Sequence, residues 1–398
     1  MNKSSSKLWT GQFTAIVAMA FLFFLCLQIL TAGFPAYISD VKQDPTQAGL
    51  MTTVFMLAAI ATRPLIGYLF HKLNMKWMSI ITLVVITLTI ALSYGQDSVP
   101  MLLLLRALHG VGFGIITTIF STLATNIIPI KRIGEGIGYY GLATSVGTSI
   151  APMVALSVLF YYSYNLLILI SVLLTVATLV LSFLIKTPQK AKTNVPKKNK
   201  ITFKEYAFDK RALLPCLLTS FFTISLGGVV SFLKELGNEA RLGGEISIFF
   251  LIMTVVMTII RPISGRMFDS YGHKIIIYAG AISGIIGLFL LSITQGTFTL
   301  FLAGALYGIS YGVTTPTLQA IAVSSVDKEK QGTANAMYFS CMDLGMAIGS
   351  TGLGFLASKT SFHFIYGFSA LFIVMLLIVY TISLKKVKLE TVLKEVAS

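Results

Sequence analysis

Two charged side chains stand inside long apolar runs of this sequence, where a charge costs free energy. Asp343 lies in the run FSCMDLGMAIGS and Arg106 in the run LRALHGVGFG. An arginine at the centre of a membrane helix costs about 3 kcal/mol on insertion scales, so it usually has a partner or a task. An acid in this setting suits proton uptake and release, and an arginine suits proton coupling or an anionic ligand. The alternative is structural, with Asp343 bonded to hydroxyls or an arginine, and Arg106 bonded to backbone carbonyls.

Polar and aromatic residues near the middle of the apolar runs are the candidate contacts for a ligand. Aromatic rings suit an amphipathic molecule, because they offer a large apolar surface with a polar group at one edge. Tyrosines near the ends of the runs, such as Tyr161, Tyr162 and Tyr164, are better explained as an interfacial belt. The predicted substrate-binding residues are Gln28, Thr31, Arg106, Tyr140, Thr144, Tyr307, Tyr311 and Tyr338.

The elements that must position these residues are apolar segments long enough to cross a membrane. Hydrophobic residues make up 55% of the 398 residues and charged residues 11%, against about 25% charge in soluble domains. A spanning helix needs about 20 apolar residues, whereas the strands of a transmembrane barrel are shorter and alternate. We therefore predict an all-α membrane protein with twelve transmembrane helices, near residues 12–38, 47–70, 77–94, 100–128, 134–159, 163–185, 212–234, 244–268, 274–293, 297–325, 332–357 and 361–384.

The basic residues predict the orientation of these helices. Most Lys and Arg residues fall in alternate connections, which the positive-inside rule assigns to the cytoplasm together with both termini. Arg63 and Arg261 are counted among these connection charges. The longest polar connection, 186–211, is predicted to be a cytoplasmic linker. It separates an N-terminal six-helix bundle, 1–185, from a C-terminal six-helix bundle with a short cytoplasmic tail, 212–398.

An internal repeat supports the division into two bundles. Residues 63–77 read RPLIGYLFHKLNMKW and residues 261–275 read RPISGRMFDSYGHKI, so identical residues recur 198 positions apart. Asn74 aligns with Gly272, and both residue types tolerate the left-handed backbone of a tight turn. Parallel halves related by an axis along the membrane normal are a recurring transporter architecture. The same offset pairs Gly110 with Gly308, Gly114 with Gly312, Gly134 with Gly332 and Gly147 with Gly345.

The loop that ends the second copy of the repeat resembles a motif of the major facilitator superfamily. The family pattern is G-x3-D-[RK]-x-G-x-[RK]-[RK], and Gly265, Asp269, Gly272 and Lys274 match it. The first copy keeps Gly67 but lacks the acid. The resemblance implies that the acid faces the positive N-terminal end of a helix in the other half and that these residues form a conformational latch.

Two further segments resemble this superfamily. The run around Arg106 looks like the family element R-x-x-[QH]-G-x-G, whose glycines allow another helix to approach closely. Gly138, Gly147 and Pro152 match the spacing of G-x8-G-x3-G-P, a pattern of antiporters in the superfamily, with Ala151 in place of the third glycine. The resemblance implies a helix-packing motif at the interface of the halves and membership of the twelve-span drug/proton antiporter branch. Packing alone is the alternative.

The resemblance implies a proton-coupled secondary active transporter that exports a small amphipathic molecule by rocker-switch alternating access. Exporters of drugs, metabolites and opine metallophores look alike at this level. The alternative is a proton-coupled symporter that imports a sugar or an organic acid, and a membrane sensor or lipid flippase is a further hypothesis. Asp343 and Arg106 are the predicted proton-coupling residues. The protein is expected to be a monomer in the bacterial plasma membrane, with its substrate, protons and lipids as partners.

Several kinds of site have no signature in this sequence. There is no G-x4-G-K-[ST] motif and no arguable nucleophile and base, so an enzyme is not expected. Cys26, Cys216 and Cys341 lie far apart and form neither a metal-ligand spacing nor a disulfide framework. The net charge of +15 comes from basic residues between apolar runs, so nucleic acid is not an expected partner. No cofactor and no metal are expected.

Overall fold

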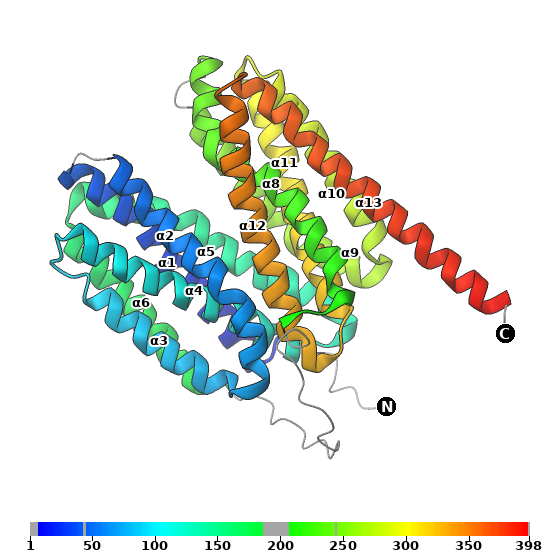
Figure 1. Ribbon diagram of the computed structural model, residues 1–398, viewed down its shortest axis with the longest axis horizontal. Helices are drawn as coiled ribbons and strands as arrows, with labels where there is room; N and C mark the ends of the chain where they lie inside the picture. The colour runs from blue at the N-terminus through cyan, green and yellow to red at the C-terminus, as the bar shows by residue number, and fades with distance from the viewer. Residues whose placement is uncertain (1–6, 43–44, 186–206, 243–244, 397–398) are drawn as a thin grey trace. The chain divides into compact units, whose positions relative to one another are not determined.

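The computed structural model describes residues 7–42, 45–185, 207–242 and 245–396, and this part of the chain is helical (Figure 1). Two short 3-10 turns, η2 (Ile130–Arg132) and η4 (Lys328–Lys330), precede α5 and α12. The long helices of the first half are α1 (Gly11–Lys42), α2 (Pro45–Lys72), α3 (Met75–Ala91), α4 (Val99–Ile127), α5 (Ile133–Tyr161) and α6 (Tyr164–Leu184). Those of the second half are α8 (Lys210–Glu239), α9 (Ile246–Tyr271), α10 (His273–Ser292), α11 (Thr297–Ser324), α12 (Gln331–Ala357) and α13 (Phe362–Val396).

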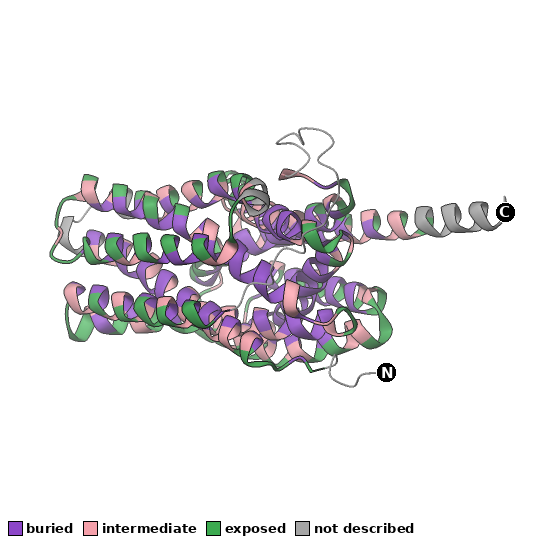
Figure 2. Ribbon diagram, turned by 90° about the horizontal axis from the view of Figure 1, so that it is seen from below, coloured by how far each residue is buried: buried purple, intermediate pink, exposed green. Residues whose placement is uncertain are grey.

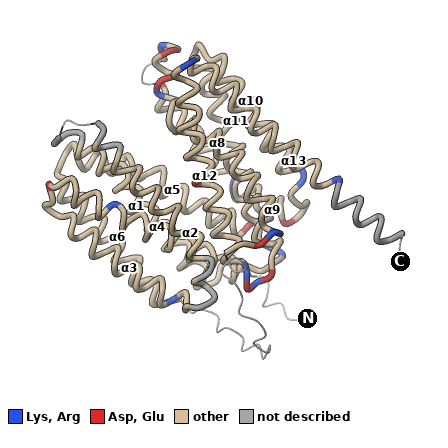
Figure 3. Tube along the Cα trace, viewed as in Figure 1, with Lys and Arg blue, Asp and Glu red and all other residues tan. Residues whose placement is uncertain are grey.

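Length and composition explain how these helices suit a membrane. Ten described helices are long and apolar enough to cross one, and Leu50–Ile66 and Met75–Ala91 are shorter apolar helices. Backbone polar groups find no water in lipid, so a helix that bonds its own backbone is stable there. Figure 3 shows most of the charged residues towards helix ends, with long uncharged stretches between them and few charges in the middle of a helix. The predicted all-α membrane protein of twelve helices is confirmed.

Three details of the helix ends differ from the sequence predictions or extend them. The last helix, predicted over 361–384, continues to Val396. The left-handed backbone considered for both tight turns of the repeat occurs only at Gly272, where φ is +76°. Asn74 has φ −78° and instead caps α3, because its side chain accepts a hydrogen bond from the amide of Lys76 at 2.9 Å. The predicted linker 186–211 lies outside the described residues up to position 206.

The described helices form two compact units. Unit 1 comprises Met1–Ala212 with Ala322–Ser340, and unit 2 comprises Leu213–Ile321 with Cys341–Ser398. In unit 1, α1 packs against α5 and α6, and α2 packs against α4; in unit 2, α10 packs against α13 and α9. Figure 2 shows the buried residues along one face of many of these helices. Helix α12 is shared between the units, since it passes from one to the other between Ser340 and Cys341. The division into bundles at 186–211 stays a prediction.

The repeat seen in the sequence is built with the same helix contacts in each unit. A Cβ at Gly110 in α4 would lie 2.2 Å from the carbonyl oxygen of Phe55 in α2. A Cβ at Gly308 in α11 would lie 2.7 Å from the carbonyl oxygen of Met253 in α9, at the same offset along the chain. Small residues therefore let the backbones touch in the same register in both units. One turn further on, the same pattern joins Gly114 to Ala59 and Gly312 to Met257.

A buried arginine is repeated in the same way. The guanidinium of Arg63 lies 5.7 Å from the ring centre of Phe113 in unit 1, and that of Arg261 lies 5.4 Å from the ring centre of Tyr311 in unit 2. Their exposed fractions are 1% and 5%. The prediction that both are connection charges is wrong, because the aromatic rings accept the cations and α2 and α9 continue through both positions.

Candidate functional site

Arg106 lies in the middle of α4 and is fully buried within unit 1. Its Nη2 donates a hydrogen bond to the Oγ1 atom of Thr31 in α1 at 3.2 Å. Its Nε donates a longer hydrogen bond, 3.4 Å, to the carbonyl oxygen of Met51 in α2. The remaining nitrogen, Nη1, is buried without a hydrogen-bond partner in the structure. The guanidinium therefore keeps an unused donor.

Aromatic rings supply much of the remaining environment of Arg106. Its guanidinium lies 4.2 Å from the ring centre of Phe55 and 5.2 Å from that of Phe34. Such contacts favour a cation that has left water. None of the ion pairs between described residues includes Arg106. The site is a buried positive charge held by dipoles and rings, which can accept a carboxylate or another anionic group.

The aromatic surroundings of Arg106 extend to α6. Tyr164 is 7% exposed and stacks on Tyr37 with ring centres 3.9 Å apart, and Tyr37 donates a hydrogen bond to Asp97 at 2.6 Å. Phe34 contacts the Tyr164 ring edge-on, with centres 5.9 Å apart. Tyr164 is therefore buried in this aromatic cluster, whereas Tyr161 and Tyr162 are exposed, and its place in the interfacial belt stays a prediction.

The other predicted binding residues of unit 1 do not all gather at Arg106. Among them, the structure brings Thr31 into hydrogen-bond contact with the arginine. Gln28 is half-buried in α1, and Thr144 in α5 donates a hydrogen bond to the carbonyl of Gly141 at 3.0 Å. Tyr140 is buried in α5 with no hydrogen-bond partner for its hydroxyl in the structure. Tyr338 is buried in the part of α12 that belongs to unit 1.

The predicted residues of unit 2 form a second aromatic group. Tyr307 is fully buried, and its hydroxyl lies 2.8 Å from that of Ser225. Tyr307 and Tyr311 both stack on Phe222, each with ring centres 5.9 Å away. Asp343 is half-buried in α12. The coupling role of Asp343 stays a prediction.

The predicted latch and packing residues lie on helices or at their ends. Gly265 is buried and Asp269 half-buried in α9, Lys274 is exposed at the start of α10, and Gly67 lies in α2. These positions leave the latch role a prediction.

The packing stripe lies in α5. Gly138 is buried and Pro152 is exposed. A Cβ at Gly147 would lie 2.9 Å from the carbonyl oxygen of Phe21, so the backbones of α5 and α1 touch at this point. The stripe thus contacts a helix of its own unit here, and an interface role between the halves stays a prediction.

Sequence reasoning missed a polar cluster that joins α12 to α4 within unit 1. Ser121 donates a hydrogen bond to the side-chain oxygen of Asn335 at 2.9 Å. The amide nitrogen of Asn335 donates in turn to Thr125 at 3.3 Å. All three side chains are buried, with exposed fractions of 3% or less. Serine, threonine and asparagine in apolar helices carry no distinctive spacing, so nothing in the sequence marked this cluster.

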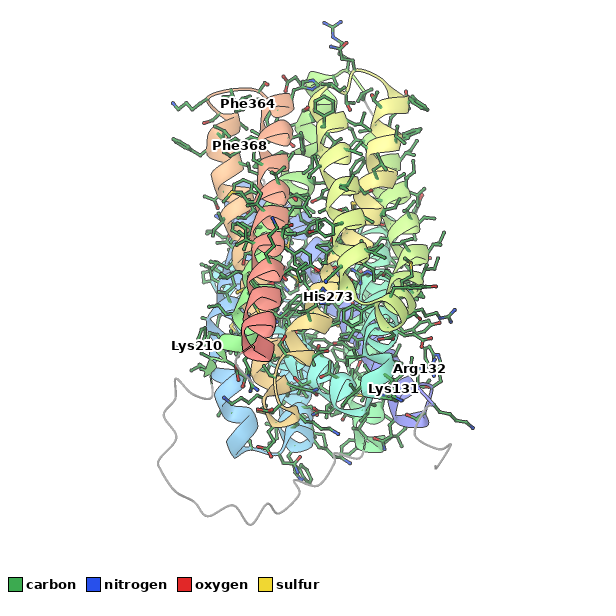
Figure 4. All side chains as sticks on the ribbon, turned by 90° about the vertical axis from the view of Figure 1, so that its right-hand side faces the viewer. Lys131, Arg132, Lys210, His273, Phe364 and Phe368 are labelled. Carbon is green, nitrogen blue, oxygen red and sulfur yellow. The ribbon has the colours of Figure 1, made fainter. Side chains whose placement is uncertain are left out.

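A second missed cluster consists of charges beside the start of α8 and η4. Arg211 forms ion pairs with Asp209 at 3.1 Å and with Asp327 at 2.7 Å, and Lys330 pairs with Asp209 at 3.2 Å. The hydrogen bonds from Arg211 lower the pKa of Asp209 to about 2. Lys210 lies towards the same end of unit 1 as Lys131 and Arg132 (Figure 4).

Comparisons with known proteins agree with this architecture. A family model described as the Major Facilitator Superfamily matches residues 16–350, and a second match covers 242–396. The staphylopine export protein of Staphylococcus aureus is 19% identical over 92% of this chain and 94% of its own length.

Two solved structures share the fold. The human organic anion transporter MFSD10 superposes with a TM-score of 0.78 at 14% identity, covering 92% of this chain and 98% of that one. The Escherichia coli fucose:proton symporter FucP superposes with a TM-score of 0.71 at 17% identity, covering 92% and 97%. Twelve helices, a repeat built in the same register in both halves, and a family match over most of the residues lead to one conclusion: the chain belongs to the major facilitator superfamily of transporters.

Proposed function

We propose that this protein is a proton-coupled secondary transporter that exports a small amphipathic molecule carrying a carboxylate. The observation that carries the proposal is Arg106, a fully buried cation with an unused donor and no ion pair with a described acid. An anionic substrate group would complete its hydrogen bonds and balance its charge, while Phe34 and Phe55 would contact an apolar part. Membership of a transporter superfamily supplies the coarser function.

Export is supported by the antiporter-like stripe of Gly138, Gly147 and Pro152 and by the likeness to a staphylopine exporter. A metallophore, a drug or another metabolite with a carboxylate all suit Arg106. Protons are the proposed driving ion, with Asp343 carrying the proton in α12. In this proposal the two halves tilt to expose the site alternately, and the latch residues around Asp269 steady one of the two states.

The proposed setting is a bacterial plasma membrane, with both termini and the 186–211 connection in the cytoplasm. A monomer is sufficient for this mechanism. The second candidate is a proton symporter that imports an organic acid, and the likeness to a fucose:proton symporter favours keeping it. The two candidates differ in whether protons and substrate cross in opposite directions or together.

Purified protein in liposomes tests the proposal. A pH gradient is imposed in each direction, and movement of radiolabelled organic anions is compared with that of neutral analogues of the same size. Antiport predicts accumulation in the compartment that holds more protons, whereas symport predicts accumulation in the other one. A transport rate that does not depend on the pH gradient contradicts the proposal. So does faster transport of the neutral analogues than of the anions.

Metabolite profiling supplies candidate substrates. Bacterial cells with and without the gene are grown in separate cultures under the same conditions, and the small molecules inside the two kinds of cell are compared. Carboxylates that build up inside the cells lacking the gene are the substrates expected of an exporter. Failure to take up a carboxylate nutrient is the result expected of an importer.

A further inference from the structure

Two of the three cysteines lie on neighbouring helices of unit 2. Cys216 is in α8 and is fully buried, and Cys341 is in α12 and is half-buried. In the sequence they are separated by several helices, which is why their spacing gave no signal. The third cysteine, Cys26, lies in unit 1 and donates a hydrogen bond to the carbonyl oxygen of Ser171 at 3.3 Å.

The packing of α8 on α12 places the two cysteines at matching positions. A Cβ at Gly349 would lie 2.1 Å from the carbonyl oxygen of Ile224, and a Cβ at Gly345 would lie 2.7 Å from that of Ser220. Each step of four residues along one helix is thus matched by four along the other, so the helices run parallel in one register. One further step of four residues reaches Cys216 and Cys341.

A direct contact confirms the register at the level of the cysteines. The hydroxyl of Ser220, one turn from Cys216, donates a hydrogen bond to the carbonyl oxygen of Cys341 at 2.8 Å. Glycines at Gly345 and Gly349 bring the two backbones close, and a disulfide needs Cα atoms about 4.4–6.8 Å apart.

We propose that Cys216 and Cys341 form a dithiol modification site that a two-electron thiol oxidant closes into a disulfide, and that this closure slows transport. In the reaction both S–H bonds break and one S–S bond forms. Two electrons and two protons pass to the oxidant; a diazene such as diamide becomes a hydrazine, and a small disulfide becomes two thiols. The bond ties α8 to α12 at the residue where α12 passes from one unit to the other. Restraint at that point opposes any movement that needs α12 to shift on α8.

Thiol counting tests the chemistry without any substrate. The purified full chain is treated with diamide and unfolded in detergent. Its free thiols are then alkylated, and its mass is measured by mass spectrometry. We expect one alkylated thiol in place of the three in the untreated chain, together with a peptide pair joined through Cys216 and Cys341. Cys26→Ser is the matched control and should still form the bond, whereas Cys216→Ser and Cys341→Ser should each keep two free thiols. Three alkylated thiols after diamide, or a bond that includes Cys26, overturns the proposal.

Transport measurements test the effect of the bond. Diamide should lower the initial rate in liposomes several-fold in the unmodified chain and in Cys26→Ser, and dithiothreitol should restore it. The rate of Cys216→Ser should not respond to diamide. A mapped disulfide with an unchanged rate overturns the regulatory part. Because the thiol count needs no substrate, it still decides the chemistry if the proposed function fails.

Discussion

At the residue scale, Arg106 combines full burial with partial satisfaction of its donors. A buried charge is expensive because it has left water, and rings or carbonyl dipoles repay only part of that cost. Arg106 has two hydrogen bonds, two aromatic rings nearby and one nitrogen without a partner in the structure. This environment is the one expected of a cation that binds an anion. Substitutions of Arg106 can test whether it does so.

Arg106→Lys keeps the positive charge but removes the planar fork of donors. Hydrogen bonds to charged groups contribute about 1.5–3 kcal/mol, so we expect substrate affinity to fall about ten-fold or more. Arg106→Ala should abolish binding of the anionic substrate. Binding is measured by titration of the purified protein in detergent. Lys359→Ala, a change at an exposed lysine, serves as the control and should bind normally. Equal substrate affinities for all three variants would mean that Arg106 has a structural role and does not bind the substrate.

Asp343→Asn keeps the size of the side chain but can no longer release a proton. We expect uphill transport driven by a pH gradient to be lost, while exchange of labelled for unlabelled substrate continues. The folded state is checked by the melting temperature. Glu329→Gln is the control, because Glu329 is exposed in η4. Normal uphill transport by Asp343→Asn removes this residue from the coupling mechanism.

At the element scale, small residues set how closely the helices pack. A Cβ at Gly110 would lie 2.2 Å from the carbonyl oxygen of Phe55, so a side chain there forces α2 and α4 apart. At Gly352 in α12 nothing lies within 4 Å of a Cβ. These two glycines make a matched pair in which the same substitution meets a backbone in one case and open space in the other.

Gly110→Ala should destabilise the protein by about 1–3 kcal/mol, the usual cost of overpacking. Gly352→Ala should leave stability nearly unchanged. Melting temperatures of both purified variants give the comparison. The first substitution also displaces Phe55, which contacts Arg106, so substrate affinity should fall with it. Equal melting temperatures for the two variants would mean that the α2–α4 contact is looser than the structure has it.

The elements could be predicted from the sequence far better than the surroundings of the site. Long apolar runs identify membrane helices, because lipid leaves the backbone few alternatives. Gly110 and Gly308 share an offset, and the structure gives them equivalent contacts. Phe34 and Phe55 next to Arg106 could not be found in this way, because their spacing matches that of many other apolar residues. Asn335 and Ser121 are far apart in sequence, and only the fold brings them together.

At the scale of the whole molecule, charges near the helix ends add to the contacts between helices. Asp209 is 6% exposed and forms ion pairs with Arg211 at the start of α8 and with Lys330 in η4. These two pairs connect the start of α8 to η4. Its pKa is lowered to about 2 from the ordinary value of 3.8. The stabilisation from this carboxylate is therefore complete above pH 3.8 and is lost as the pH falls through about 2.

Asp209→Asn should lower the free energy of unfolding by about 0.5–1 kcal/mol at neutral pH, since Arg211 is partly exposed and solvent screens the pair. The difference between Asp209→Asn and the unmodified chain should be constant from pH 7 to pH 5. It should shrink as the pH falls below about 4, towards the range where the carboxylate takes up its proton. Melting temperatures across this range provide the test, and a difference that grows on acidification would contradict the assignment.

Orientation in the membrane is a second property of the whole chain. Basic residues in alternate connections predict that both termini face the cytoplasm. Green fluorescent protein fused after Ser398 should fluoresce in bacterial cells, and alkaline phosphatase at the same place should be inactive. Alkaline phosphatase inserted at Gly95, between α3 and α4, should be active. Reversed activities at the two positions would overturn the orientation.

The shared helix register of the two units bears on how the molecule arose. A gene duplication leaves two copies whose side chains start identical, so later differences record what each copy took on. Opposite Arg106 in the first copy stands Gly304 in the second, and opposite Asp343 in the second stands Ser145 in the first. At each of these two positions, one copy carries an ionisable group that its sister lacks. An ancestor of two equal copies would have been symmetric about an axis along the membrane normal, and these two positions give its descendants' halves different ionisable groups.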